Sequence, residues 1–356
     1  MSRSIKLGIY TAAKLLGLFR VSRRITAKQL RILAYHGFAD GDETRFRDKL
    51  FIAAKTFERR LGMLKRGGYH VLPLGQALQT FDATALRPGT VAITIDDGYA
   101  STLYIAAPLL HAHGMPATVY LTSYHMHTQT PVFDLVVAYL VWKTPATRVS
   151  VNWPAGAEAK EYDLSTPSVR GRTLAEIVAL GHCLASEPER VRLSRALAEQ
   201  FSLDYDEIVA KNTFRLMTPS EAKEVQLLGV EIGLHTHRHR FPTDDLQACR
   251  RELRDNLNYL HETLGVSPKH FCYPSGVYSP MQWSVLKEFD LASATTCDTG
   301  LVAPGDSPYA LRRFLDGESV SDIEFEAEIS GFAGLLRAFL GIDRRAPGAQ
   351  LIRGVE

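Results

Sequence analysis

Cysteine is scarce in this sequence, and neither sign of charge is in excess. The 356 residues include only four cysteines, Cys183, Cys249, Cys272 and Cys297, and no two of them form a C-x-x-C pair. That spacing predicts neither a disulfide framework nor a zinc knuckle. The net charge of +2 is too small for the basic field that marks a nucleic-acid-binding protein. We therefore expect no nucleic-acid partner.

Long apolar runs are missing as well. No stretch is apolar over the roughly 20 residues that a helix needs to cross a bilayer. In the N-terminal stretch MSRSIKLGIYTAAKLLGLFR, Lys14 interrupts the apolar residues and no clear small-residue cleavage site follows. This pattern does not predict a signal peptide. We expect a cytoplasmic protein.

The first segment, residues 1–30, has the pattern of an amphipathic helix. At helical spacing, one face is apolar and another is basic: Ile5, Ile9, Ala12, Leu16 and Phe19 against Arg3, Lys6, Lys14 and Arg20. Two roles fit this pattern. The helix either packs on the protein's own core, which we favour, or lies peripherally on the inner membrane surface. The C-terminal helical segment, residues 321–356, presents the same alternatives through the run GFAGLLRAFLGI.

Strand-like and helix-like segments alternate through the rest of the chain. Apolar runs fit strands at residues 31–36, 70–74, 91–95, 117–122, 230–234, 270–274, 291–296 and 310–315. Helical periodicity is clearest at residues 57–65, 102–113 and 245–264. Such alternation is typical of a parallel sheet, and about eight repeats favour closure. We therefore predict an α/β fold, an irregular (β/α) barrel of about seven to eight strands with a large insertion, over residues 31–320.

One segment interrupts the alternation. About ninety residues separate the fourth expected strand from the fifth, and we place the insertion at residues 125–215. Within it, residues 187–201 look helical and residues 154–168 look like a loop. Inserted loops on the catalytic face of a barrel often carry specificity. The insertion is therefore either a lid or substrate platform, or an excursion without function.

Ionisable residues gather where two of the expected strands end. Asp96 and Asp97 directly follow the run 91–95, and the stretch HTHRH at 235–239 follows the run 230–234. Chemistry in a parallel barrel takes place at the carboxyl ends of the strands. One carboxylate and two imidazoles, His235 and His239, form a metal-binding triad that leaves positions open for water and substrate. The sequence thus predicts one divalent metal ion, zinc by preference, with cobalt or nickel as substitutes.

Each of these motifs is weak alone. An Asp-Gly pair is common in turns, and many H-x-x-x-H pairs are surface histidines. Their combination at strand ends is far more specific. A ferrous oxygenase uses the same ligand types, but its usual order, H-x-D followed by a later histidine, differs from the order here. His237, which lies between the two ligand histidines, is predicted to face elsewhere.

Three motifs, in this order, resemble those of the polysaccharide deacetylase (NodB-homology) family of carbohydrate esterases. They are TIDDG at 94–98, HTHRH at 235–239 and FCYPSG at 271–276, and the third looks like the F-x-Y-P-x-G form of a branch found in glycan assembly. The resemblance implies a (β/α) barrel that removes acetyl groups from glycans with a divalent metal. It also implies that Asp97, His235 and His239 bind the metal and that Asp96 is the general base.

Two positions depart from the family pattern. The third motif usually carries an arginine that orients the base, and Cys272 occupies that place. The last motif usually supplies a histidine acid, but the matching stretch ALRRFLDG at 310–317 offers Arg312 or Arg313 instead. Asp298 matches the fourth motif only loosely. The metal ligands are therefore complete, whereas the expected proton donor is absent.

Two further groups are needed to complete the chemistry: an acid and a donor to the oxyanion. His36 follows the first expected strand, which neighbours the last strand in a closed barrel, so we predict His36 as the acid and His125 as the runner-up. A strand cap or a substrate contact are the alternatives for His36. The backbone N–H near Tyr273 is predicted to donate a hydrogen bond to the oxyanion.

Two functions from different classes fit these residues. The first is a metal-dependent hydrolase that cleaves the amide (carbon–nitrogen) bond of an N-acetylated sugar in a polysaccharide, oligosaccharide or lipid-linked glycan. The second is a non-catalytic, glycan-binding relative that has lost the acid. The complete set of two aspartates and two histidines favours the hydrolase, because a pure binding protein has no need of a base such as Asp96.

Overall fold

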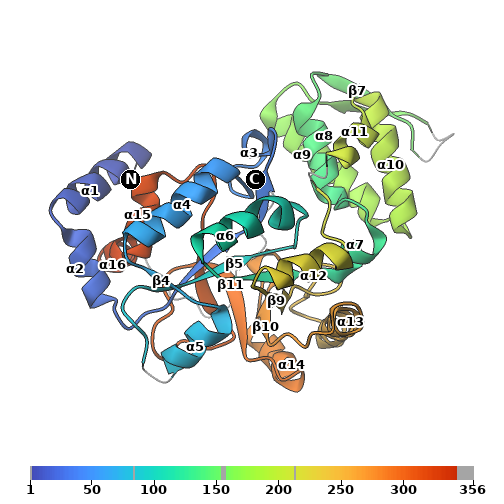
Figure 1. The fold of residues 1–356 in the computed structure, drawn as a ribbon. Coiled ribbons are helices and arrows are strands. Elements are labelled where there is room, and N and C mark those ends of the chain that lie inside the picture. Colours follow the sequence, from blue (N-terminus) through green and yellow to red (C-terminus); the bar gives the residue numbers. More distant parts are fainter. Residues whose placement is uncertain (1, 83–84, 154–157, 212–213, 343–356) are drawn as a thin grey trace. The chain divides into compact units, whose positions relative to one another are not determined.

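The computed structural model describes residues 2–82, 85–153, 158–211 and 214–342 (Figure 1). The chain divides into two compact units at residues 124/125 and 218/219. The part before and after these points forms one unit, here called the barrel unit. Residues 125–218 form the core of the other, here called the inserted unit.

Seven parallel strands close the ring of the barrel unit. In order around the ring they are β1 (Arg31–Tyr35), β12 (Leu311–Leu315), β11 (Ser293–Thr299), β10 (His270–Cys272), β9 (Val230–Leu234), β6 (Ala117–Leu121) and β5 (Thr90–Ile95). β5 returns to β1 in an unbroken register from Arg31 with Val91 to Tyr35 with Ile95. An eighth strand, β4 (His70–Val71), pairs with β5 outside the ring. The predicted barrel of seven to eight strands with a large insertion is confirmed.

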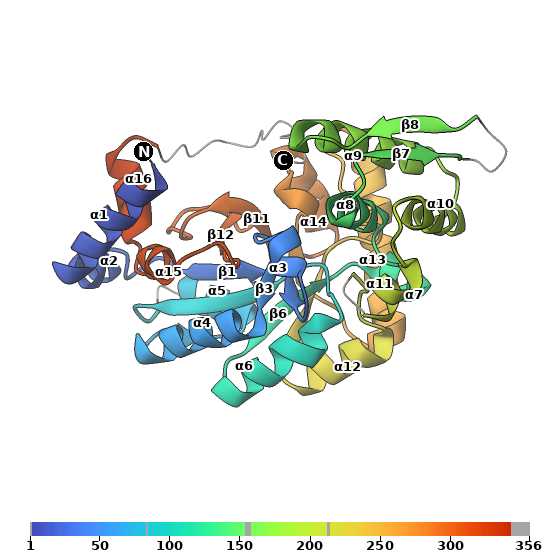
Figure 2. The same cartoon turned by 90° about the horizontal axis from the view of Figure 1, so that it is seen from above.

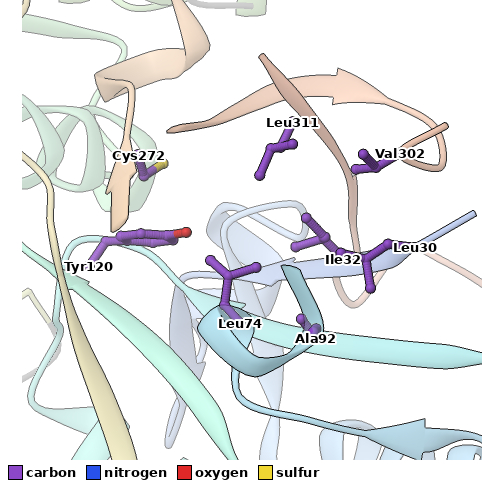
Figure 3. Close-up of a cluster of buried hydrophobic side chains, with 9 residues drawn as sticks. Leu30, Ile32, Leu74, Ala92, Tyr120, Cys272, Val302 and Leu311 are labelled. Atoms are coloured by element: carbon purple, nitrogen blue, oxygen red, sulfur yellow. The ribbon is translucent and has the colours of Figure 1, made fainter. Parts of the chain in front are cut away.

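The barrel closes because its strands are apolar along both faces. Every residue of β1, β5 and β6 is buried, as parallel strands covered on both sides require. Figure 3 shows apolar side chains from several strands and from α5 meeting in one cluster. It comprises Leu30, Ile32, Leu74, Ala77, Ala92, Tyr120, Cys272, Val302 and Leu311. This core holds the strands, and therefore their carboxyl ends, in fixed relative positions.

Helices cover the outside of the barrel. They are α4 (Ala54–Arg66), α5 (Leu74–Asp82), α6 (Ala107–His113) after a π-helical turn at Thr102–Ala106, α12 (Pro219–Leu227), α13 (Leu246–Leu264) and α14 (Trp283–Glu288). Short 3₁₀ turns at Pro274–Gly276 and Pro280–Gln282 follow β10. Figures 1 and 2 show α4, α6 and α12 following one another along one side.

Some elements differ from the sequence-based expectation. The run 70–74 is a strand only at its first two residues, because α5 already begins at Leu74. Two short strands that were not predicted, β2 (Gly37–Ala39) and β3 (Phe51–Ala53), pair in parallel around the helix α3 (Glu43–Phe46). At three residues each, they are too short to show a period in the sequence.

Both ends of the barrel unit are helical. α1 (Arg3–Leu15) and α2 (Leu18–Ile25) stand where the sequence suggested one amphipathic helix, and Gly17, with φ of 75°, separates them. They pack against α15 (Asp322–Ile329) and α16 (Phe332–Phe339) through Tyr10, Ala13, Phe19, Ala327 and Ala333. Residues 343–356 of the predicted C-terminal segment lie outside the described residues. Among the described residues, no helix has both the length and the apolar character needed to cross a membrane.

The inserted unit combines helices with one hairpin. Its elements are α7 (Ser123–Thr128), which begins in the barrel unit, α8 (Phe133–Lys143), β7 (Arg148–Val151), β8 (Lys160–Asp163), α9 (Pro167–His182), α10 (Glu187–Gln200) and α11 (Tyr205–Ala210). β7 and β8 pair antiparallel. The loop expected at 154–168 is therefore wrong for the part described, since β8 and the start of α9 lie there. Residues 154–157 fall outside the described residues.

Candidate metal centre and its neighbouring carboxylate

Two adjacent aspartates, Asp96 and Asp97, follow the end of β5 and have different surroundings. The Asp96 N–H donates to the Tyr35 carbonyl at 2.8 Å and so continues the ladder between β5 and β1. Asp97 leaves the ladder with φ of 68°, in the left-handed region, where aspartate is among the few residues tolerated. This turn of the backbone separates the two carboxylates, although they are neighbours in sequence.

Asp97 faces two imidazoles. Its Oδ1 lies 3.2 Å from Nε2 of His235 and 3.4 Å from Nε2 of His239. One ligand atom from each of the three residues lies within 4.8 Å of the others. His235 follows β9 directly, and His239, with φ of 56°, turns back toward it. The structure thus brings together the three residues predicted as metal ligands.

A backbone carbonyl fixes the orientation of His235. Its Nδ1 lies 2.8 Å from the carbonyl oxygen of Cys272, and this carbonyl can only accept a hydrogen bond. Nδ1 therefore carries a proton, and Nε2 is the nitrogen that faces Asp97. Nε2 donates a hydrogen bond to that carboxylate when it is protonated and offers its lone pair to a metal ion when it is not. Histidines that bind metals are commonly held in this way. One carboxylate oxygen and two imidazole nitrogens in this arrangement fit a divalent transition-metal ion.

The charges around Asp97 favour its ionised form. Burial raises the pKa of this carboxyl, but the hydrogen bond from His235 and the charges of His239 and His36 lower the pKa well below its usual range. A carboxylate that stays ionised is ready to bind a cation. His237 is directed elsewhere, because its Nδ1 lies 2.8 Å from Oγ of Ser123.

Asp96 has a different partner, Arg313 of β12. The guanidinium donates from Nη1 to Oδ1 and from Nη2 to Oδ2, both at 2.7 Å, a bidentate pair. Both side chains are buried, with exposed fractions of 0% for Arg313 and 2% for Asp96. Burial raises the pKa of Asp96, but the charge and hydrogen bonds of Arg313 lower the pKa below its usual value.

All five N–H groups of Arg313 have an acceptor. Besides the two bonds to Asp96, they reach the Thr296 carbonyl at 2.8 Å, Oγ1 of Thr94 at 3.0 Å and Sγ of Cys272 at 3.2 Å. Arg313 thus supplies the guanidinium beside Asp96, and Cys272 accepts one of its hydrogen bonds.

The sequence contained a signal for this pairing. Side chains alternate along a strand, so Leu311 and Arg313 share one face of β12. Leu311 lies in the barrel core, and therefore Arg313, rather than Arg312, enters the barrel. From the sequence, Arg312 and Arg313 were identified only as residues in the place of a histidine. The contact of Arg313 with Asp96 was not predicted.

The two residues predicted to complete the chemistry differ in their surroundings. Nε2 of His36, just after β1, lies 3.5 Å from Oδ2 of Asp96. The N–H of Tyr273 already donates to the Thr295 carbonyl at 3.1 Å, as part of the pairing of β10 with β11. The N–H of Tyr273 itself is thus engaged in the sheet, and the role of a backbone N–H near Tyr273 as oxyanion donor stays a prediction. His125, the alternative acid, begins the inserted unit.

Comparisons with known proteins give a family match over part of the chain. Residues 194–294 match the model of the polysaccharide deacetylase family. Over 94 residues the chain is 32% identical to the Bacillus subtilis protein YxkH, whose name describes it as a polysaccharide deacetylase. That match spans 26% of this chain and only about a third (32%) of the relative. Over these stretches the chain is similar to polysaccharide deacetylases.

Solved structures share the fold over most of the chain. The Streptococcus pyogenes deacetylase PplD aligns with a TM-score of 0.56 over 85% of this chain and 98% of its own, at 15% identity. A de-N-acetylase from Aggregatibacter actinomycetemcomitans gives 0.54 over 84% and 98%, at 14% identity. IcaB from Ammonifex degensii gives 0.52 over 86% and 97%, at 15% identity. At such low identity these likenesses establish the barrel fold alone.

Proposed function

We propose that this chain is a metal-dependent hydrolase that removes the acetyl group from an N-acetylated sugar of a glycan. One observation carries the proposal. A carboxylate and two imidazoles converge within 4.8 Å, and a second carboxylate next to them in sequence is held by a buried arginine. Metal ligands and a separate oriented base are two of the three parts that a metal-assisted amide hydrolysis requires, and a proton donor is the third.

The first part is the metal centre. Asp97, His235 and His239 would hold one divalent ion, and zinc is the ion we propose, because one carboxylate and two imidazoles are a common zinc ligand set. When bound, such an ion polarises the acetyl carbonyl and lowers the pKa of a water molecule. The protein's own contribution is to keep Asp97 ionised and to present Nε2 of His235 toward it.

The second part is the base. Asp96 takes the proton of the attacking water, and Arg313 serves it in two ways. The guanidinium keeps the buried carboxylate ionised, and its bidentate geometry fixes the direction of the carboxylate plane. Arg313 does not touch the reacting atoms in this scheme. It is a positioning residue, in the place that an arginine at position 272 would otherwise fill.

The third part is the proton donor. An amine leaves poorly unless it is protonated, and no histidine follows β12. His36 is the imidazole that lies beside the base, 3.5 Å from Asp96. We assign it the acid role for two reasons. β1 and β12 are neighbours in the closed ring, and His36 follows β1 on the side where the other functional residues lie.

The substrate class follows from the same resemblance. The stretch FCYPSG at 271–276 has the F-x-Y-P-x-G form of the branch of deacetylases that works in glycan assembly, and we propose that branch for this chain. A polysaccharide, an oligosaccharide or a lipid-linked glycan would each offer the N-acetyl group. The alternative, a non-catalytic glycan-binding protein, gives no reason for an oriented, ionised Asp96.

The test is acetate release from a panel of N-acetylated glycans. The purified chain is stripped with a chelator and then assayed alone and with zinc, cobalt or nickel. We expect acetate only after metal is restored, and release about 10²–10⁴-fold slower from Asp96→Asn with metal restored. Glycan binding by the metal-loaded chain without acetate release from any member of the panel would favour the binding protein instead.

A further inference from the structure

The terminal helix α1 has two apolar faces, and only one of them is packed. Tyr10 and Ala13 are buried against α15 and α16. Most of the apolar stripe predicted from the sequence faces solvent, although its last residue, Phe19, is buried. Ile5, Ile9 and Leu16 are 57%, 37% and 75% exposed. Packing on the protein's own core therefore explains one face of α1 and leaves the other unexplained.

α2 extends the exposed apolar surface. Leu18, Val21 and Ile25 lie three and four residues apart along the helix, on one face, and are 40%, 48% and 65% exposed. Leu15, just before the turn at Gly17, is 84% exposed. We define the elbow surface as Leu15, Leu16, Leu18, Val21 and Ile25. Side chains of this kind rarely gather in water without a partner.

A basic cleft adjoins the elbow surface. It has a volume of about 610 Å³, and its lining includes Leu15 together with Lys14, Arg20, Arg23 and Arg66. Glu326 is the one carboxylate of the described lining, and it pairs with Lys14. Arg23 is fixed in the cleft by its hydrogen bonds to the carbonyls of Gly67 and Gly68, at 2.5 and 2.6 Å. The cleft is thus suited to an anionic group.

The N-terminal sequence that carries the elbow surface has positive charges and no acidic residue. Residues 1–39 contain no aspartate and no glutamate. Arg20 and Arg24, one helical turn apart, are exposed on α2 beside the apolar stripe. A second copy of this chain would bring the same positive charge to the same surface, which opposes self-association there. An anionic bilayer offers both an apolar interior and negative headgroups.

We infer that the elbow surface docks on an anionic lipid bilayer. The apolar side chains enter the boundary between headgroups and acyl chains, and the cleft receives the phosphate of a headgroup. The inference does not depend on the proposed catalytic function. It would keep the barrel unit at a membrane surface, where a lipid-linked glycan would also be found.

Binding of the full chain to vesicles tests the inference. Co-sedimentation is measured with vesicles of phosphatidylcholine containing phosphatidylserine, and with phosphatidylcholine alone, at low and high salt. We expect binding to the anionic vesicles that weakens as salt rises, since basic residues supply part of the attraction. Absence of binding at low salt, or equal binding to both kinds of vesicle, would overturn the inference.

Two matched pairs of variants locate the surface. Leu15→Glu should weaken binding on the order of tenfold or more, whereas Leu227→Glu, at an equally exposed leucine (87%) of α12, should not. Arg20→Glu/Arg24→Glu should abolish binding, whereas Arg254→Glu/Lys287→Glu, with the same change in net charge, should retain it. Unchanged melting temperatures establish that the variants fold. Equal effects within a pair, or a change of sedimentation coefficient instead of lipid binding, would contradict the docking surface.

Discussion

On the base side of the site, Asp96 is 2% exposed and both of its carboxylate oxygens accept hydrogen bonds from Arg313. On the metal side, Asp97 is 15% exposed and faces the two imidazoles of His235 and His239. A permanent positive charge thus balances one carboxylate, whereas titratable groups that also bind metals face the other. This difference explains how two adjacent carboxylates can end a buried strand. Their repulsion is small compared with what each gains from its own partner.

The backbone conformation also differs between the base side and the metal side. Asp96 remains in the regular ladder between β5 and β1. Asp97, Thr236 and His239, on the metal side, have φ of 68°, 65° and 56°. Residues other than glycine rarely adopt such angles, and those that do cluster at functional sites. The metal side therefore has a specialised backbone, whereas the base side depends on one buried side chain from β12.

The largest effect is expected when a metal ligand is removed. His239→Ala removes one of three ligands and should leave the purified protein with little or no bound zinc after reconstitution, together with loss of acetate release. His237→Ala is the matched control, because His237 faces Ser123 and should keep both metal and activity. Elemental analysis of the two variants measures the zinc bound per protein molecule. Equal metal content in both would contradict the assignment of His239 as a ligand.

The second prediction concerns Arg313, which supplies the positive charge beside Asp96. Arg313→Met leaves Asp96 buried without its partner, which should cost about 3–5 kcal/mol of folding stability and lower the rate about 10²–10³-fold. Cys272→Arg alone should also impair activity, because two guanidinium groups would compete for one carboxylate. The double variant Cys272→Arg/Arg313→Met should regain part of the rate, with kcat recovering more than KM changes.

The double variant separates positioning from general damage to the core. Metal content is measured for all three proteins and should be nearly unchanged, since Asp97 and its histidines are not altered. Arg313→Lys serves as a further control: it retains the charge without the bidentate geometry and should recover stability better than rate. A double variant no better than the worse of the two single variants would contradict the idea that position 313 replaces position 272.

The smallest expected effect concerns the acid. His36→Ala should slow release of acetate from an N-acetylated sugar about 10²-fold, because the amine leaving group needs a proton. Hydrolysis of 4-nitrophenyl acetate should change little, since that leaving group departs without protonation. Parallel assays measure, for each substrate, the rate of His36→Ala relative to that of the unaltered protein. A similar loss on both would show that His36 supports the site in some other way.

Strands and metal ligands could be predicted from the sequence because both are local features. The apolar runs before Asp96 and His235 mark strand ends, and parallel strands bring their ends together. The pairing of Asp96 with Arg313, by contrast, is not a local feature of the sequence. It depends on closure of β12 against β1 and on which face of β12 Arg313 occupies. The use of the Tyr273 N–H is also not local, since only the pairing with β11 shows that it donates to Thr295. The oxyanion donor near Tyr273 therefore stays a prediction.

One side-by-side measurement tests the division between the two carboxylates most directly. Asp96→Asn and Asp97→Asn are reconstituted with zinc and compared for bound metal and for acetate release. Asparagine is also tolerated at positive φ, so the second variant keeps the backbone of position 97. The account predicts that Asp96→Asn keeps the metal and loses about 10²–10⁴ in rate, whereas Asp97→Asn loses the metal. Equal loss of metal in both variants, or full activity in Asp96→Asn, would contradict it.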